Sequence, residues 1–193
     1  MGADDVTVAR MQTVSMAQLR SRFGLPCDKT LIVTGGKIDH NKPEILDLLR
    51  AFQDGPNGFE LVAFGNVVQE YEQKFNELIK SPRVHYLGWL SAEDSMAAMA
   101  ASDLVVFPGL HSVMWEQAVA LGKPLMLRRI HGTQHLDLGG NIMFLNSGTQ
   151  EAIADALNAL ATDQTLLPSL TRNAFKRERE DFLYDRIAEA SLS

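Results

Sequence analysis

The sequence predicts an α/β fold, a doubly wound parallel sheet of about six strands with helices on both faces. Six short apolar runs of strand length are separated by segments of helix length: TLIV, ELVAFG, RVHYLG, DLVVFP, PLML and IMFL. This alternation favours parallel strands joined by helical crossovers. The runs are apolar almost continuously, as strands covered on both faces require. An open antiparallel sheet fits this pattern poorly.

Helix starts are marked by polar residues that can cap a first turn. Three capping pairs are Asn41 with Glu44, Ser91 with Asp94, and Ser147 with Gln150. Behind the first pair, apolar residues recur at helical spacing up to Phe52. Ser112 is expected to cap a further helix that ends at Gly122. The charged segment 174–192 is predicted to be helical, with Phe182, Leu183 and Ile187 packed inward.

Length and composition indicate one compact domain over residues 1–193, because 193 residues with 46% hydrophobic content form one well-packed core. The net charge of −6 argues against nucleic acid as a partner. The lone Cys27 excludes an internal disulfide framework. Neither a signal peptide nor a run of membrane-spanning length is visible, so we expect a cytoplasmic protein.

The loop TGGKIDHNK follows the first predicted strand and leads into a helix. Gly35 and Gly36 let the backbone turn sharply and approach a ligand, while Lys37 and Lys42 bracket the loop. This chemistry suits a phosphate or diphosphate, and parallel sheets bind ligands at such strand ends. The alternative is that the glycines only form a turn and the lysines are ordinary surface charges.

Glu116 lies in the early turns of the helix after the fourth strand, where a carboxylate can accept hydrogen bonds from two ribose hydroxyls. Alternatively, it is a surface acid near a helix N-terminus. His131, His135 and Asp137 form a set that could bind zinc, but we favour a polar loop on the ligand side of the sheet. Arg128 and Arg129 either add positive potential there or pair with surface acids.

Three segments together resemble the C-terminal donor-binding domain of GT-B glycosyltransferases, family 4: GGKIDHNKPEILDLLRAF, RVHYLGWLSAEDSMAAMAASDLVVFP and WEQAVALGKPLML. The resemblance runs from about Leu31 to the end of the chain. It implies a Rossmann-like half of a GT-B fold that binds a nucleotide sugar, with no cofactor and no metal. Residues 1–14 then resemble the interdomain connector of such enzymes. The resemblance then implies that the N-terminal acceptor domain is absent from this chain.

The resemblance also implies residue roles. Lys37 and Lys42 would hold the donor diphosphate and act as the catalytic pair by stabilising the leaving group, with Lys37 in place of the family's arginine. Gly35, Gly36 and Ser112 would join the diphosphate contacts. The loop Leu87, Gly88 and Trp89 would lie beside the nucleobase. Glu116 would bind the ribose.

One departure concerns the first of the family's two glutamates, whose place is taken here by Pro108 in a shortened loop. The donor sugar must therefore be contacted by other residues, and we predict that these include His111 and His131. The resemblance implies a retaining transferase that acts on an acceptor glycan or lipid-linked sugar in polysaccharide or glycan biosynthesis. The full-length enzyme would then lie in the cytoplasm or at the inner membrane face. The shortened loop also suggests a nucleotide-sugar 2-epimerase-like enzyme as an alternative, and the missing first glutamate suggests a non-catalytic nucleotide-binding module.

Overall fold

A computed structural model of the chain describes residues 1–192. At its centre is a six-stranded sheet whose neighbouring strands are all parallel, in the order β3-β2-β1-β4-β5-β6. The strands are β1 (Thr30–Gly35), β2 (Phe59–Phe64), β3 (Val84–Tyr86), β4 (Leu104–Phe107), β5 (Leu125–Arg128) and β6 (Ile142–Leu145). All six predicted strands are therefore present, and the predicted doubly wound fold is confirmed. The strand order changes direction between β1 and β4, which is where such sheets bind ligands.

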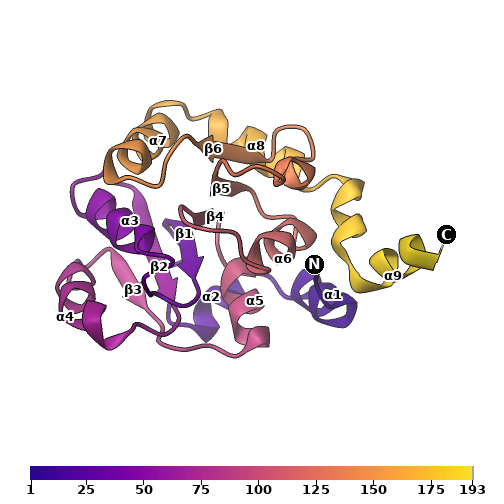
Figure 1. Cartoon of the computed structure of the whole chain (residues 1–193), viewed down its shortest axis with the longest axis horizontal. Helices are drawn as coiled ribbons and strands as arrows, with labels where there is room; N and C mark the ends of the chain where they lie inside the picture. The colour runs from indigo at the N-terminus through magenta and orange to yellow at the C-terminus, as the bar shows by residue number, and fades with distance from the viewer. Residues whose placement is uncertain (193) are drawn as a thin grey trace.

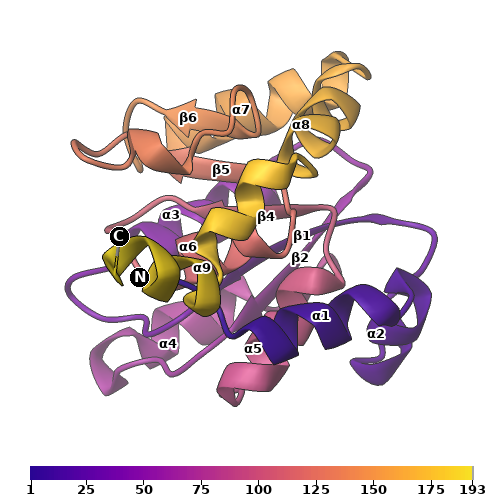
Figure 2. The ribbon, with the colours of Figure 1, turned by 90° about the vertical axis from the view of Figure 1, so that its right-hand side faces the viewer.

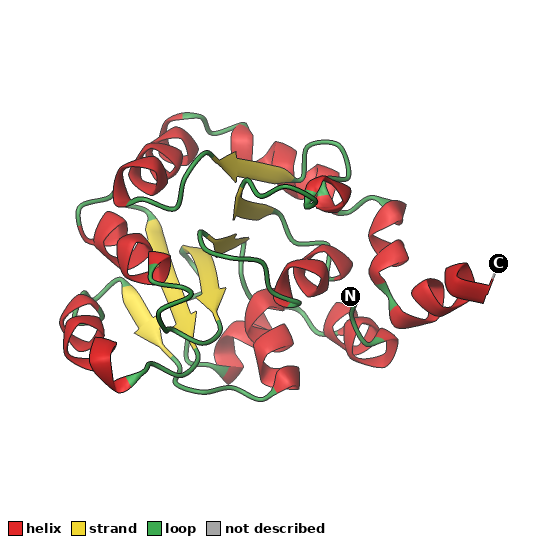
Figure 3. Cartoon of the chain, in the orientation of Figure 1, coloured by secondary structure: helices red, strands yellow, loops and turns green. Residues whose placement is uncertain are grey.

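Helices cover both faces of the sheet, as Figure 1 and Figure 2 show. One layer consists of α3 (Glu44–Gln53), α4 (Gln69–Leu78), α7 (Gln150–Thr162) and α8 (Leu166–Ala174). The other consists of α1 (Asp5–Thr13), α2 (Met16–Arg22), α5 (Ala92–Ala100) and α6 (Met114–Ala120). The chain also forms the short 3-10 helices η1 (Gln134–Leu136) and η2 (Arg177–Phe182) and the final helix α9 (Tyr184–Leu192). Figure 3 shows the strands enclosed by these helices.

The central strands divide their side chains between two apolar cores, because successive residues of a strand point to opposite faces. In β1, Leu31 and Val33 pack into the core beneath α5 and α6, whereas Ile32 packs into the core beneath α3 and α7. All three are fully buried. Within residues 1–192, no helix combines the length and the apolar character needed to cross a membrane.

The predicted helix caps are correct in part. Ser91 caps α5 as predicted, since its Oγ accepts a hydrogen bond from the Asp94 N–H at 3.0 Å. Asn41 does not cap α3: the helix begins at Glu44 behind Pro43, whose fixed φ suits a helix start, and no side chain caps it.

The prediction for α7 is also wrong, because the capping residue is Thr149 and not Ser147. Thr149 directly precedes the helix, and its Oγ1 accepts a hydrogen bond from the Ala152 N–H at 3.4 Å. Ser147 lies two residues further from the first turn and instead contacts Thr149 through its hydroxyl.

The C-terminal segment is helical in two pieces, η2 and α9, instead of one. The break lies at Leu183, where the backbone is extended and pairs with Ala3 near the N-terminus. The Ala3 N–H donates to the Phe182 carbonyl at 2.8 Å, and the Tyr184 N–H donates to the Ala3 carbonyl at 3.0 Å. Phe182 is buried as predicted, and Leu183 and Ile187 are half-buried. The two ends of the chain thus lie side by side, with α9 away from the sheet (Figure 1).

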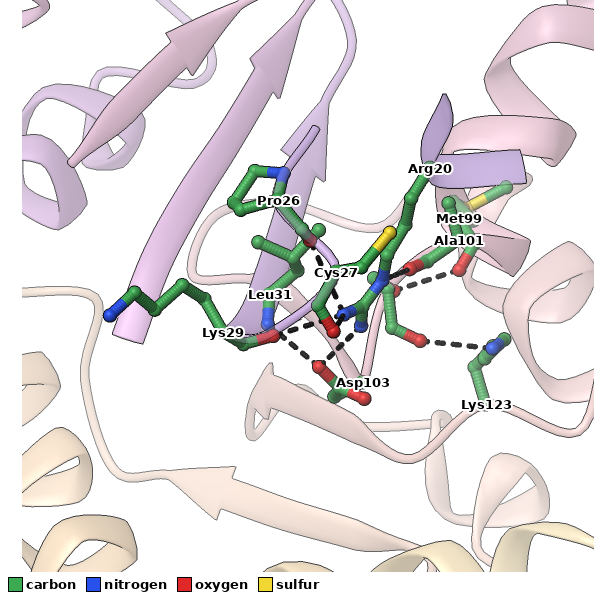
Figure 4. Close-up of polar contacts among 10 residues, drawn as sticks. Arg20, Pro26, Cys27, Lys29, Leu31, Met99, Ala101, Asp103 and Lys123 are labelled. Atoms are coloured by element: carbon green, nitrogen blue, oxygen red, sulfur yellow. Dashed lines mark hydrogen bonds and ion pairs between the residues drawn. The ribbon is translucent and has the colours of Figure 1, made fainter. Parts of the chain in front are cut away.

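A buried arginine ties α2 to the amino edge of the sheet (Figure 4). Arg20 is 5% exposed and donates from Nε to the Ala101 carbonyl at 2.9 Å and from Nη1 to the Lys29 carbonyl at 3.0 Å. Its Nη2 donates to Asp103 Oδ2 at 2.7 Å, and the same oxygen accepts the Leu31 N–H at 2.7 Å. A buried charge is tolerated where it is paired and hydrogen-bonded in this way.

Lys123 lies in the same cluster and donates to the Ser102 carbonyl at 2.9 Å (Figure 4). Burial lowers the pKa of its ammonium group to about 8, and the attraction of Asp103 only partly offsets this. The cost of burying the cation is therefore present at neutral pH.

We predict that Lys123→Met stabilises the fold at neutral pH. The pKa of Lys123 falls from 10.5 to about 8 on folding. The unfolded chain therefore binds more protons between these values, and the stability of the unsubstituted chain rises with pH across that window. The variant should gain about 1–3 kcal/mol in free energy of unfolding at pH 7, a gain that disappears above pH 10.5. Urea unfolding at both pH values measures it, and a gain that does not change with pH would contradict this account.

Candidate functional site

Three strand-to-helix loops meet by direct backbone contact at the carboxyl edge of the sheet. The Gly36 N–H donates to the Phe64 carbonyl at 3.1 Å, and the Gly65 N–H donates to the Gly88 carbonyl at 2.7 Å. A Cβ atom at Gly65 would lie 1.8 Å from the Gly36 carbonyl oxygen. Gly36, Gly65 and Gly88 have φ values of +117°, +123° and +69°, a region that favours glycine. These glycines therefore fix the relative positions of the loops after β1, β2 and β3.

The two predicted lysines take different positions. Lys42 is half-buried, and its Nζ lies 4.0 Å from the position that a Cβ of Gly36 would occupy. Burial lowers the pKa of Lys42, opposed by the nearby carboxylates of Asp39 and Glu44. The Lys37 side chain is 68% exposed, and its Nζ pairs with Asp39 Oδ2 at 3.1 Å. Among residues 1–192, Lys37 thus has an anionic partner, whereas no group accepts a hydrogen bond from Lys42 Nζ.

Asp39 organises the lysine loop and was not identified from the sequence. It is 8% exposed, and its Oδ1 accepts the Asn41 N–H at 2.9 Å while its carbonyl accepts the Lys42 N–H at 2.9 Å. The hydrogen bond from Lys37 lowers the pKa of its carboxyl group. An Asp two residues before an Asn in a loop is a signal for this side-chain turn.

A pocket of about 260 Å³ opens beside the glycine loops, and its walls include Gly36, Lys37, Asn66, Trp89 and Met114. Trp89 is 68% exposed, so a broad aromatic face stands free at the mouth. Met114 closes the pocket toward the β1 loop, because its Cε lies 2.9 Å from the Cβ position of Gly36. Sequence reasoning identified Trp89 for this region and missed Asn66 and Met114.

The three residues of the predicted base loop, 87–89, do not all lie at the pocket, because one of them packs against the core. The Leu87 N–H donates to the Ala63 carbonyl at 2.9 Å, and its side chain packs against the core beneath α5 and α6. The Gly88 carbonyl accepts a hydrogen bond from the Gly65 N–H. Only Trp89 of the three has its side chain at the pocket.

Glu116 is not a surface acid. Its side chain is 4% exposed, and its Oε1 lies 2.9 Å from His111 Nε2 and 4.0 Å from His135 Nε2. Its Oε2 is buried without a hydrogen-bond partner among the described residues. The structure therefore brings His111 and Glu116, both predicted, together with His135. Ser112 does not cap α6 as predicted, because Val113 takes the N-cap position and no side chain caps the helix; Ser112 Oγ accepts the Met114 N–H at 3.3 Å.

A second carboxylate at this edge was not assigned to the site from the sequence. Glu44 Oε1 accepts a hydrogen bond from Arg128 Nη1 at 3.0 Å. Arg128 therefore pairs with an acid, which was one of the two alternatives that the sequence left open. Glu44 Oε2 is buried and has no hydrogen-bond partner in the described part of the chain. A Cβ atom at Gly109 would lie 2.9 Å from Oε2, and one at Gly148 would lie 2.6 Å from the Glu44 Cγ.

His131, which was also predicted to contact the donor sugar, has an exposed side chain and is not part of the Glu116 contacts described above. In residues 1–192, no three His, Cys, Asp or Glu side chains gather closely enough to hold a metal ion. His131, His135 and Asp137 thus do not form the cluster that the zinc interpretation would require.

The fold and the position of these loops define a Rossmann-like domain of the kind that forms one half of a GT-B enzyme. The chain matches the family model of glycosyl transferases group 1 over residues 28–163, and it belongs to that family. A comparison with curated proteins finds no match.

Solved structures share the fold at low sequence identity. Sucrose-phosphate synthase (tll1590) from Thermosynechococcus elongatus is 18% identical, with a TM-score of 0.76 over 99% of this chain and 50% of that chain. Anabaena Alr3699/HepE in complex with UDP-glucose is 20% identical, with a TM-score of 0.75 over 99% of this chain and 56% of that one. The C-terminal domain of a glycosyl transferase group 1 family protein (LpcC) from Francisella tularensis is 17% identical, with a TM-score of 0.68 over 98% of both chains. The chain spans about half the length of the first two.

We predict that Gly65→Ala strongly destabilises the fold. A methyl group there meets the Gly36 carbonyl oxygen at 1.8 Å, and the residue has a positive φ. The free energy of unfolding should fall by about 2–4 kcal/mol. Gly58→Ala is the matched control, since Gly58 has a φ of +105° but nothing within 4 Å of its Cβ position. Equal losses in the two variants, measured by urea unfolding, would show that the backbone contact is unimportant.

Proposed function

We propose that this chain is the donor-binding domain of a glycosyltransferase, which binds a nucleoside diphosphate sugar at the carboxyl edge of the sheet. The observation that carries the proposal is the Lys42 ammonium group. It is half-buried against the Gly36 loop and, within residues 1–192, donates to no acceptor. A cation that has lost part of its hydration without gaining a direct partner favours the binding of an anion.

A diphosphate suits this position better than a single carboxylate. The backbone at Gly36 allows close approach, and the N-terminus of α3 begins two residues after Lys42. Lys37 would exchange Asp39 for a phosphate oxygen. Gly35 is the last residue of β1, and Ser112 lies in the loop between β4 and α6. The two phosphates of the donor would thus lie beside the two ammonium groups of Lys37 and Lys42.

The other parts of the donor follow from the strand order. With the diphosphate at the end of β1, the nucleobase lies toward β3, in the pocket beside Gly88 and Trp89. The buried Oε2 of Glu116, which has no hydrogen-bond partner in the described residues, would accept a ribose hydroxyl once a small rearrangement exposes it. The transferred sugar then points toward the loops after β4 and β5, where His111 and His131 lie.

The chemistry assigned to this domain is stabilisation of the leaving group. The bond from the anomeric carbon to the diphosphate oxygen breaks, and its electron pair remains on the diphosphate, beside Lys37 and Lys42. The acceptor oxygen bonds to the same carbon, and its proton passes to a phosphate oxygen of the departing diphosphate. In this proposal no metal is needed, because lysines and backbone amides carry the charge.

An acceptor domain would supply the second substrate, an acceptor glycan or lipid-linked sugar. Consistent with this, the chain spans about half of the longer solved structures that it resembles. We assign the reaction to the retaining class, in cytoplasmic polysaccharide or glycan biosynthesis, with attachment to the inner membrane face through the acceptor half.

We predict that Lys42→Ala weakens donor binding selectively. Calorimetric titration with UDP-glucose, GDP-mannose and ADP-glucose should identify one preferred donor. Loss of a charged hydrogen bond should then cost about 1–3 kcal/mol of binding free energy in Lys42→Ala. Lys74→Ala, on the exposed surface of α4, is the matched control and should bind like the unsubstituted chain. Undiminished binding by Lys42→Ala would contradict the assignment of the diphosphate site.

A further inference from the structure

The buried charge of Glu116 is balanced by histidines alone. Its carboxylate has His111 Nε2 at 2.9 Å and His135 Nε2 at 4.0 Å. Among the residues that the structure describes, no lysine or arginine forms an ion pair with it. A carboxylate that is 4% exposed needs a compensating partner, and these two imidazoles are the groups placed to supply it.

The hydrogen bonds of the two imidazoles define which nitrogens carry protons. His135 Nδ1 lies 2.9 Å from the Gly132 carbonyl, which can only accept, so Nδ1 carries the hydrogen. A neutral His135 therefore turns a bare Nε2 toward Glu116, whereas a protonated His135 turns an N–H toward it. Because the carboxylate of Glu116 only accepts, His111 Nε2 carries a hydrogen and donates it to Glu116 Oε1. Both side chains reach solvent, with exposures of 29% and 56%, so protons can exchange there.

Charged groups of both signs lie around His135. It shares a pocket of about 590 Å³ with Met1, Asp137, Glu178 and Asp181, and Lys176 Nζ donates to the carbonyl of Leu138, which lines the same pocket, at 2.7 Å. The carboxylate of Asp137 is held by backbone N–H groups of its own loop. Arg179 of η2 donates to the Ala120 carbonyl at the C-terminal end of α6, whereas Glu116 lies in the first turn of the same helix.

The loop that carries His111 runs against the lysine loop at both of its ends. The Cβ position of Gly109 lies 3.9 Å from Lys42 Cα, and Met114 Cε lies 2.9 Å from the Cβ position of Gly36. His111 lies between these two contacts in the sequence. A diphosphate held by Lys42 would therefore add negative charge near this imidazole, which favours its protonation.

We propose that His111 and His135 are positioning residues for Glu116, and that donor binding takes up a proton on this pair. The inference rests on the proposed donor site. An approaching diphosphate favours the imidazolium forms, and a protonated His135 can then donate from Nε2 to Glu116 Oε1. With Oε1 held by two histidines, Oε2 remains as the acceptor for a donor hydroxyl.

Calorimetry in two buffers of different ionisation enthalpy measures the protons taken up. The probe is the preferred one of UDP-glucose, GDP-mannose and ADP-glucose, because none of these phosphodiesters titrates near pH 7. We expect the unsubstituted chain to take up about 0.3–1 proton per donor at pH 7, and the double variant His111→Gln with His135→Gln to take up less than about 0.1. His85→Gln is the matched control. It removes a histidine of β3 whose Nε2 lies 2.5 Å from Glu60 Oε2 of β2, and it should leave the uptake unchanged.

Conservative substitution separates positioning from simple loss of structure. Gln at position 111 can still donate to Glu116, so His111→Gln should keep donor affinity within about threefold while losing part of the proton uptake. His111→Ala should lose affinity about five- to twentyfold, because Glu116 Oε1 loses its donor.

Two results would overturn the inference while leaving the donor site intact. These are donor binding without proton uptake, and undiminished uptake in the double variant. Failure of the unsubstituted chain to bind any of the three nucleotide sugars would instead overturn the proposed function, and the inference with it.

Discussion

The backbone contact between Gly65 and Gly36 is the constraint on which the site depends. It leaves no room for a side chain at residue 65, and the hydrogen bond from Gly65 to Gly88 extends the contact to a third loop. The apolar sheet positions the strand ends, but these contacts determine how the loops leave it. Because the β1 loop is fixed in this way, Lys42 is held in a half-buried position with its amine beside Gly36.

The two edges of the sheet handle buried charge in opposite ways. At the amino edge, Arg20 and Asp103 satisfy each other and the surrounding backbone, which stabilises the attachment of α2. At the carboxyl edge, Glu44 and Glu116 each keep one buried oxygen without a hydrogen-bond partner in residues 1–192, and the Lys42 ammonium group is half-buried beside Gly36. Unsatisfied polar groups destabilise a fold, and they are found where a ligand is to complete the hydrogen bonding. The contrast between the edges supports the carboxyl edge as the functional one.

Much of the fold was predictable because buried parallel strands have an unmistakable sequence pattern. Continuous apolar runs gave all six strands, whereas helix caps depend on neighbouring residues: Pro43 and Thr149 start their helices in place of Asn41 and Ser147. The lysine loop was found because its glycines and cations adjoin a strand. The contact of Glu116 with His135 was not predictable, since no local pattern reports contacts between separate loops.

The most direct test of the central claim is a crystal structure of this chain with its preferred nucleotide sugar. The account predicts electron density for the diphosphate within hydrogen-bonding distance of Lys42 Nζ, with the nucleobase beside Trp89. A nucleotide bound at another surface, with Lys42 still lacking a partner, would contradict it.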